Sequence, residues 1–303
     1  MSIAEIEARE IQLEPGGSGL WRDAWSRLRR NPAALVGFAL VGLFVVCAVF
    51  APLLAPEDPR TGNLSRLGGS CCPGPSADHW FGIDQQGRDE LSRILYGARF
   101  SLLIGVVSVA VGLSVGMIFG SIAGYVGGAV DSVIMRLTDI MLAIPGLLLA
   151  IGIVAMLGPG LFQIMIAVGV TQIPIFARLM RGSILAQRDN DFVLAARSIG
   201  VPRRAILASH SLPNAISPVI VQGTLALATA IIDVAGLGFL GLGPQDPSTP
   251  EWGTMLTDTT RYLQTAPHLA IIPGVAIIIS VLGFNLIGDG LREALDPKMR
   301  GRG

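Results

Sequence analysis

Side chains that could carry out chemistry are few in this sequence and lie far apart. Asp233 is an isolated carboxylate within an apolar run, where an ionised group is costly unless it faces a partner or a wet cavity. A proton relay would be its sharpest role, but one acid without a titratable neighbour in its run is poorly suited to that work. The histidines stand in different loops, at His79, His210 and His268. We therefore expect no catalytic, cofactor or metal site in this chain.

The cysteines give no sign of a disulfide framework, since the chain has only three. Cys47 lies in the first apolar run and is expected to pack as a small hydrophobe. Cys71 and Cys72 are neighbours in a loop rich in Gly and Pro. Adjacent Cα atoms lie about 3.8 Å apart and bridged ones usually about 4.4–6.8 Å apart, so a bond between these two would be strained. A metal-binding or redox role for this pair is disfavoured, and the sequence does not determine whether the two cysteines are oxidised.

A docking surface is the more promising kind of site, and residues 191–200 indicate one. An acidic or amide residue among positions 189–191 can cap a helix start, Gly200 can adopt the left-handed conformation that ends a helix, and Pro202 prevents continuation. Phe192, Leu194, Ala195 and Ile199 fall near one face. A helix of about two or three turns does not persist alone in water, so it must dock on another surface. A linker helix on the membrane fits the periodicity equally well.

The elements that position this segment are membrane spans. Hydrophobic residues make up 51% of the 303 residues and charged ones 15%, which is too apolar for an ordinary water-soluble domain. A hydrocarbon core about 30 Å thick requires about 20 helical residues. Six runs meet this length: Ala34–Ala55, Ser101–Tyr125, Asp139–Leu157, Leu161–Ala177, Asn214–Gly236 and His268–Ile287. We therefore expect an all-helical integral membrane protein with six spans.

Small and breaking residues within the runs predict how they pack. Gly112, Gly116 and Gly120 recur at four-residue spacing, which gives one face of the second run where another helix can approach closely. Pro145 with Gly146 loosens the backbone hydrogen bonding of the third run. Kinks that shape packing and hinges of a moving pathway both fit such breaks.

Charge placement predicts the topology. If both termini are cytoplasmic, all but six of the 22 Lys and Arg residues lie on the cytoplasmic side, as the positive-inside rule requires. The exceptions are Arg60, Arg66, Arg88, Arg93, Arg99 and Arg261. Tryptophans and arginines at positions 21–30 suit an amphipathic helix at headgroup level before the first span. A zero net charge gives no reason to expect nucleic acid as a partner.

These predictions divide the chain into five parts. They are a cytoplasmic segment 1–33 with its amphipathic helix, a first span 34–55, an extracytoplasmic loop 56–100, a core 101–290 that includes segment 189–213, and a cytoplasmic tail 291–303.

Residues 85–99 of the extracytoplasmic loop have an amphipathic pattern, with Leu91, Ile94 and Leu95 on one face of a helix and the arginines elsewhere. This pattern predicts an amphipathic helix on the outer membrane surface, more plausibly a collar for the second span than a landing surface for a partner.

Segment 189–213 resembles the EAA loop of binding-protein-dependent ABC transporter permeases. The shared features are the pair Ala195-Ala196, Gly200 four positions later and Leu212-Pro213. Leu194 stands where the family has a glutamate, which removes one polar contact but leaves the apolar face and both helix breaks.

Two further stretches resemble the second-subunit permeases of the dipeptide, oligopeptide and nickel branch. They comprise His79–Asp84 with Gly87–Arg93 and Tyr96–Leu102, and Phe239–Gly243 with Pro250–Leu256. Ile83 replaces an expected threonine. The likeness extends from about Trp21 to Pro297.

The resemblance implies a type I importer permease with a cytoplasmic coupling helix. Its expected partners are a second homologous permease subunit, two ATP-binding subunits or domains that use ATP and Mg, an extracytoplasmic substrate-binding protein and membrane lipid. The residues that the resemblance implies for coupling to the ATPase are Asp191, Leu194, Ala195, Ala196, Arg197, Gly200, Pro202, Leu212 and Pro213. The candidate residues for the pathway or the subunit interface are Asp233 and Asn285.

The cargo that the resemblance implies is a di- or oligopeptide, with nickel or another small solute as the alternative. Two other classes stay open on the residues alone. An ATP-independent secondary transporter would use Asp233 as its coupling acid, and a membrane scaffold would transport nothing. The broken spans and the docking helix disfavour the scaffold.

Overall fold

The structure is a computed structural model that describes residues 20–67 and 71–295, and the chain outside those ranges, including the acidic start and most of the predicted tail, is not described. Helices dominate it, and an isolated bridge between Ile83 and Asp89 is the one β interaction among these residues. The principal helices are α2 (Leu20–Leu28), α3 (Pro32–Leu54), α4 (Glu90–Val126), α5 (Gly128–Ala143), α6 (Gly146–Leu157), α7 (Leu161–Gln187), α8 (Asp191–Ser198), α9 (Arg203–Ile206), α10 (Leu212–Leu237), α11 (Trp252–Thr259) and α12 (His268–Leu295). Short 3-10 or π turns occupy Leu64–Leu67, Leu207–Ser211, Gly238–Leu242 and Thr260–Tyr262.

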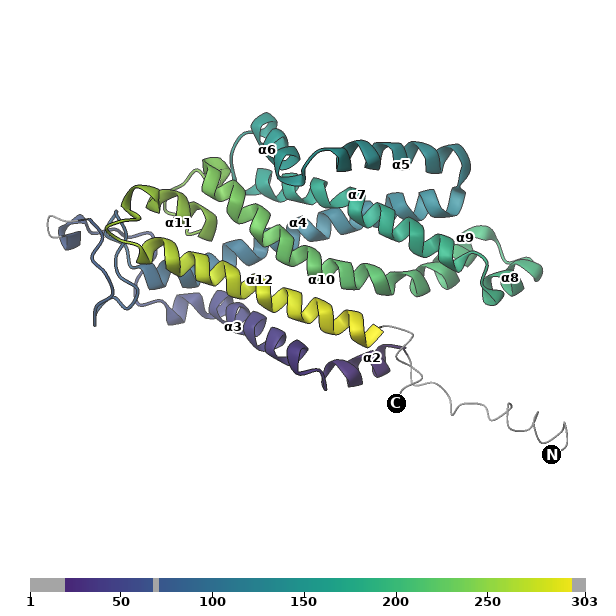
Figure 1. The fold of residues 1–303 in the computed structure, drawn as a ribbon, viewed down its shortest axis with the longest axis horizontal. Coiled ribbons are helices and arrows are strands. Elements are labelled where there is room, and N and C mark those ends of the chain that lie inside the picture. Colours follow the sequence, from purple (N-terminus) through teal and green to yellow (C-terminus); the bar gives the residue numbers. More distant parts are fainter. Residues whose placement is uncertain (1–19, 68–70, 296–303) are drawn as a thin grey trace.

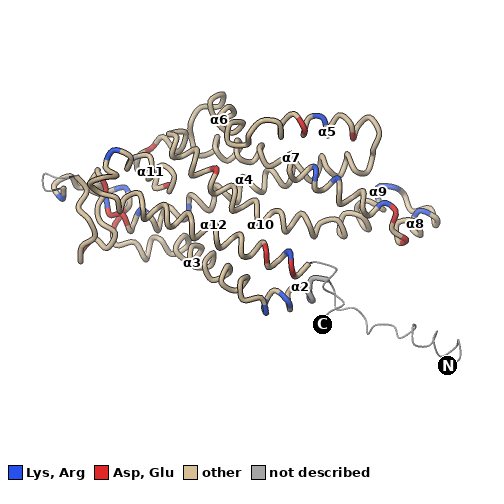
Figure 2. Tube along the Cα trace, viewed as in Figure 1, with Lys and Arg blue, Asp and Glu red and all other residues tan. Residues whose placement is uncertain are grey.

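The long helices run side by side as a bundle with two distinct ends (Figure 1). One end carries α2, α8, α9 and the last turns of α12, and we call it the α8 end. The other carries α11 and the loop 71–89, and we call it the α11 end. Charged residues gather mostly toward these ends, while long stretches of the helices between them carry none (Figure 2). The bundle therefore has the apolar middle and polar ends of a protein that crosses a bilayer.

The six-span prediction is confirmed in number with one correction. Five helices are long and apolar enough to cross a membrane, and a sixth span exists if the bent pair α5 and α6 is counted as one. The predicted third span at 139–157 is not a single helix, because α5 and α6 meet at 94°. The break falls at Ile144 and Pro145, where the missing amide of proline and the extended backbone of the preceding residue end α5.

A glycine face joins α4 to α7, as the spacing predicts. A Cβ atom on Gly112 would lie 2.5 Å from the Cβ of Gln172, and one on Gly116 would lie 2.6 Å from the Cβ of Phe176. Phe176 is fully buried in the main apolar cluster of the bundle. Only the absence of side chains on α4 lets the two backbones approach this closely.

The predicted amphipathic helix before the first span is present as α2. Its Ala24 and Leu28 are buried with Ala294 of α12, while Trp25 is half-exposed and stacks under the guanidinium of Arg29, 4.6 Å from the ring centre. Asn31 then caps α3 by accepting the amide of Ala34 at 3.1 Å. The same side chain donates to Glu293 of α12 at 2.7 Å, which ties the start of α3 to the end of α12.

The predicted surface helix at 85–99 is wrong. The helix begins at Glu90 and continues without a break into the second span as α4, with Asp89 as its N-cap. Arg88 and Arg93 are 2% exposed, so these arginines point into the protein and not toward a headgroup layer. The loop that precedes the second span is correspondingly shorter than residues 56–100.

Candidate functional site

The predicted docking helix is present as α8, and its ends follow the sequence signals. Asn190 occupies the N-cap position with an extended backbone, although its side chain donates to Gln187 and caps no amide. Gly200 has φ +81°, the left-handed conformation that ends a helix. The amide of Gly200 donates to the carbonyl of Arg197, and the amide of Val201 donates to that of Ala196, each at 3.1 Å. A capped turn of this kind gives α8 a definite length and direction.

Only one side of α8 packs on the protein. Val193 and Ala196 are buried and form a small cluster with Ile206 of α9. Phe192, Leu194 and Ile199 are exposed, and Ile199 is the extreme case at 81%. Leu194, which stands at the glutamate position of the EAA pattern, therefore presents an apolar side chain. Two exposed apolar residues on an eight-residue helix, with a third at its C-cap, are typical of a surface that another protein covers.

The segment after α8 runs into the fifth span with fewer breaks than the sequence indicates. Pro202 precedes α9, as expected, but α9, a π turn at Leu207–Ser211 and α10 follow one another without a gap. Pro213 stands at the start of α10 directly after the π turn. The wider turn accommodates a residue that has no amide to donate. Leu212-Pro213 is therefore not a hinge between two helices, and α9 extends α10 toward α8.

A cavity of about 680 Å³ lies beside α10 toward the α8 end. Its lining comes from α7, α10 and α12 and mixes apolar with polar side chains. Gln187, Asn214, Ser217, Gln222 and Arg292 supply the polar groups, and Arg292 is the one charged residue among those that line it. A cavity of this size with amide and hydroxyl groups on its wall suits a polar solute better than lipid tails.

The two candidate pathway residues lie on neighbouring helices but not in that cavity. Asp233 is on α10 and Asn285 on α12, and both are half-buried. Neither is among the residues that line the cavity. Among the described residues, Asp233 has no hydrogen bond or ion pair from its side chain.

At the α11 end the structure brings together two motif stretches about 160 residues apart in sequence. The buried Asp84 pairs with Arg88 at 2.6 Å, and Arg88 also donates to the carbonyl of Pro247 at 2.6 Å. The amide of Ser92 donates to Asp89 at 2.8 Å, and the ring of His79 lies 3.0 Å from the same carboxylate. The spacing of these residues in the sequence gave no signal of this network.

Trp252 and Glu251 join α11 to α4 in the same region. The fully buried ring of Trp252 donates to the carbonyl of Ile94 at 3.2 Å and packs over Gly97, where a Cβ atom would lie 2.6 Å from the indole. Glu251 caps α11 by accepting the amides of Gly253 and Thr254, both at 2.9 Å. Burial raises the pKa of Glu251 above its ordinary value. These two motif residues therefore hold the α11 end together and do not form an open site.

The neighbouring cysteines Cys71 and Cys72 are joined in a disulfide. The sequence leaves the oxidation state of this pair open, and in this structure the bond is formed. Cys72 packs with Ala266 and Leu269 near the start of α12. This packing attaches the loop before α4 to the start of the last span.

The fold has a counterpart among solved membrane transporters. The structure is similar to a chain of the MetNI methionine ABC transporter in an inward facing conformation, with a TM-score of 0.57 and 20% identity. The match covers 68% of this chain and 97% of that chain. At this identity the likeness establishes the fold alone.

The family follows from sequence comparison. Residues 116–301, more than half of the chain, match the family described as the binding-protein-dependent transport system inner membrane component. Residues 19–67 match the N-terminal TM domain of oligopeptide transport permease C. The chain belongs to this family of permease subunits, and it is an integral protein of a bacterial membrane.

Two named relatives are similar over nearly their whole length. The dipeptide transport system permease protein DppC of Alkalihalophilus pseudofirmus is 48% identical over 281 residues, which is 92% of this chain and 90% of that protein. The glutathione transport system permease protein GsiD of Salmonella paratyphi A is 50% identical over 281 residues, 93% of this chain and 91% of that protein. The resemblance found from the motifs is thereby confirmed.

Proposed function

We propose that this permease subunit forms half of the translocation pathway of an ATP-driven importer and that α8 transmits the motion of an ATPase to that pathway. The observation that carries the proposal is the connection from α8 through α9 and the π turn into α10, which lines the large cavity. Val193 and Ala196 of α8 pack on Ile206 of α9. Because α9, the π turn and α10 then follow one another without a gap, a push on α8 reaches the wall of the cavity. Such a push shifts the state of the transporter only if α8 makes different contacts in the two states.

The partners in this proposal are those of the family. Two ATP-binding subunits use ATP and Mg and receive α8, with contacts from Asp191, Leu194, Ala195, Arg197 and the exposed apolar residues. A second permease chain completes the pathway, and an extracytoplasmic binding protein delivers the solute. This arrangement puts the α8 end and both termini in the cytoplasm, in agreement with the distribution of Lys and Arg.

The proposed cargo is a di- or oligopeptide. The names of the relatives support it, since one is a dipeptide permease and another a glutathione permease, and glutathione is itself a small peptide. Amide and hydroxyl groups on the cavity wall are suited to peptide groups, and Arg292 to a carboxylate. Nickel is the alternative cargo, but this cavity offers the neutral oxygens and the cation of Arg292, a poor set of ligands for a transition metal.

Replacement of Gly200 by isoleucine tests the coupling. The left-handed backbone at this position costs a residue with a Cβ about 1–2 kcal/mol, while nothing lies within 4 Å that the new side chain would strike. Gly200→Ile should therefore change the direction of the chain after α8 without disturbing the bundle. In vesicles with the complete transporter and its binding protein, we expect less peptide taken up for each ATP hydrolysed.

Gly182→Ile is the matched control, because Gly182 lies within α7, is exposed and also has open space around its Cβ position. It adds the same side chain to the α8 end without the unfavourable φ. Equal uptake per ATP in the wild type and in both variants would remove the basis of the coupling proposal.

A secondary transporter is the rival class, and Asp233 is the observation in its favour, since no described partner balances this carboxylate. Uptake driven by a proton gradient in vesicles that lack the ATPase, and lost in Asp233→Asn, would support the rival.

A further inference from the structure

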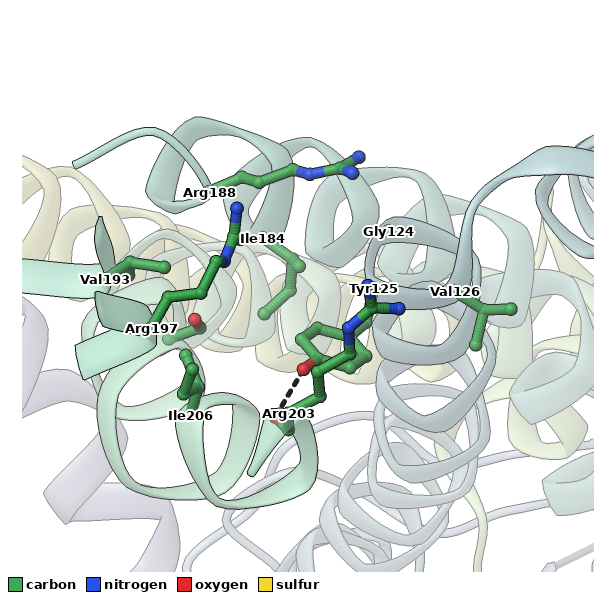
Figure 3. A pocket seen from close by; sticks show the side chains of 10 residues that line it. Gly124, Tyr125, Val126, Ile184, Arg188, Val193, Arg197, Arg203 and Ile206 are labelled. Atoms are coloured by element: carbon green, nitrogen blue, oxygen red, sulfur yellow. Dashed lines mark hydrogen bonds between the residues drawn. The ribbon is translucent and has the colours of Figure 1, made fainter. Parts of the chain in front are cut away.

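A second, smaller cavity lies at the α8 end, between α8, α9 and the last turns of α4 and α7 (Figure 3). Its volume is about 130 Å³. Ile184, Val193 and Ile206 form an apolar floor, and each of them is 2% exposed. Tyr125 adds an aromatic ring, and its hydroxyl donates to the carbonyl of Arg203. The cavity is therefore held between four elements and is distinct from the larger cavity beside α10.

Three arginines surround this floor, and each comes from a different element. Arg188 follows α7, Arg197 is on α8 and Arg203 begins α9 (Figure 3). All three are exposed at the surface and line the cavity. In the described ranges no carboxylate lies within 4.0 Å of any of their guanidinium groups. Three like charges at one cavity repel one another unless an anion lies between them.

Both carboxylates of α5 are paired with other arginines. Asp131 of α5 accepts Arg181 at 2.6 Å, and Asp139 accepts Arg178 at 2.8 Å. The charge at the cavity is therefore not balanced by α5. Asp189 and Asp191, which flank the start of α8, form no ion pair with the three arginines either. Within the described residues the three arginines therefore have no anionic partner.

The direction that the cavity faces favours a ligand from the membrane over a protein. Val193 belongs to the buried side of α8, and Arg197, although exposed, lines the cavity. Phe192, Leu194 and Ile199 are exposed and do not line the cavity. Val126, at the end of α4, adds an apolar side chain that is 61% exposed to the rim. A cavity with cations above and exposed apolar groups at its edge, at the end of membrane helices, fits a headgroup with its acyl chains.

We propose that Arg188, Arg197 and Arg203 form a binding site for a phosphate group, supplied by an anionic phospholipid at the α8 end of the bundle. Guanidinium groups match phosphate oxygens in geometry and charge, and basic pockets at the ends of membrane helices are suited to anionic headgroups. A bound headgroup bridges α7, α8 and α9 and so restrains the coupling helix. The inference rests on the proposed function only for the leaflet concerned, the cytoplasmic one.

The test uses the full chain purified in neutral detergent and titrated with short-chain phosphatidylglycerol, with occupancy measured by native mass spectrometry. The variant is Arg188→Gln combined with Arg203→Gln, which leaves the proposed coupling residue Arg197 in place. We expect its affinity to fall about fivefold for each arginine removed. Arg204→Gln is the control, since Arg204 is exposed beside Arg203 but does not line the cavity, and it should stay close to the wild type.

Competition experiments identify the source of the phosphate group. If phosphatidylglycerol binds in an excess of inorganic phosphate, and phosphatidylcholine does not replace it, the ligand is an anionic headgroup. If inorganic phosphate displaces it, the same site takes free phosphate. Thermal unfolding midpoints of all variants, measured without lipid, show that they are folded.

Two results would overturn the inference. One is the same affinity for phosphatidylglycerol in the wild type, the double variant and the Arg204 control. The other is an equal loss of affinity in the double variant and in the Arg204 control, which would make the effect one of surface charge and not of this cavity. Neither result depends on the proposed coupling to an ATPase, because lipid binding is measured on the permease chain alone.

Discussion

At the scale of single residues, the side chains at the α11 end show how burial changes what a motif does. Glu251 has the charge and position of an outward-facing group, yet it is fully buried and caps α11. Arg88 is likewise buried between Asp84 and a backbone carbonyl. Buried charges of this kind are costly unless every partner is present, so their loss should affect stability before it affects transport.

Two substitutions of Glu251 separate its hydrogen bonds from its charge. Glu251→Gln keeps an oxygen that can accept from the α11 amides, so we expect a change in stability below about 1 kcal/mol. Glu251→Leu leaves buried amides without an acceptor and should cost about 1–3 kcal/mol. Thermal unfolding midpoints of the detergent-solubilised chain measure both, and equal effects would argue against the capping role.

The same residue predicts a dependence of stability on pH. Burial raises the pKa of Glu251 above its ordinary value of 4.5, so the folded chain keeps this proton to a higher pH than the unfolded chain does. The contribution of Glu251 to stability is therefore greatest below pH 4.5 and declines as the pH rises through the raised pKa. The difference in free energy of unfolding between the wild type and Glu251→Gln, measured as a function of pH, should show this decline. A difference that does not change with pH would contradict the prediction.

At the scale of elements, the contact between α4 and α7 depends on glycine. Gly116→Ala places a methyl group 2.6 Å from the Cβ of Phe176 and 2.7 Å from the carbonyl of Ile173, so the helices must separate. We expect a loss of about 1–3 kcal/mol in stability, although alanine is the better helix former. Gly42→Ala on α3 is the control, because nothing lies within 4 Å of that position. Similar unfolding midpoints for the two variants would rule out the close packing.

At the scale of the whole molecule, the structure has two ends, and the proposed topology assigns them to opposite sides of the membrane. Single cysteines at Ala77 and Asp189, both exposed, report on the α11 and α8 ends when the native cysteines are replaced by serine. We expect a membrane-impermeant maleimide to label Ala77→Cys on intact cells and Asp189→Cys only after permeabilisation. The reverse pattern would place α8 outside, where no ATP-driven partner could reach it.

The sequence by itself determined the apolar spans, the glycine face of α4 and the ends of α8. These features are local, because a helix in lipid must satisfy its own backbone hydrogen bonds and a left-handed glycine ends a helix wherever it stands. Only the tertiary structure decided that α5 and α6 diverge at Pro145 and that Arg88 and Arg93 are buried. The same holds for the three arginines that meet around one cavity. The reason is that burial and charge balance depend on segments far away in the chain, such as Pro247 against Arg88, and no spacing within a single segment records them.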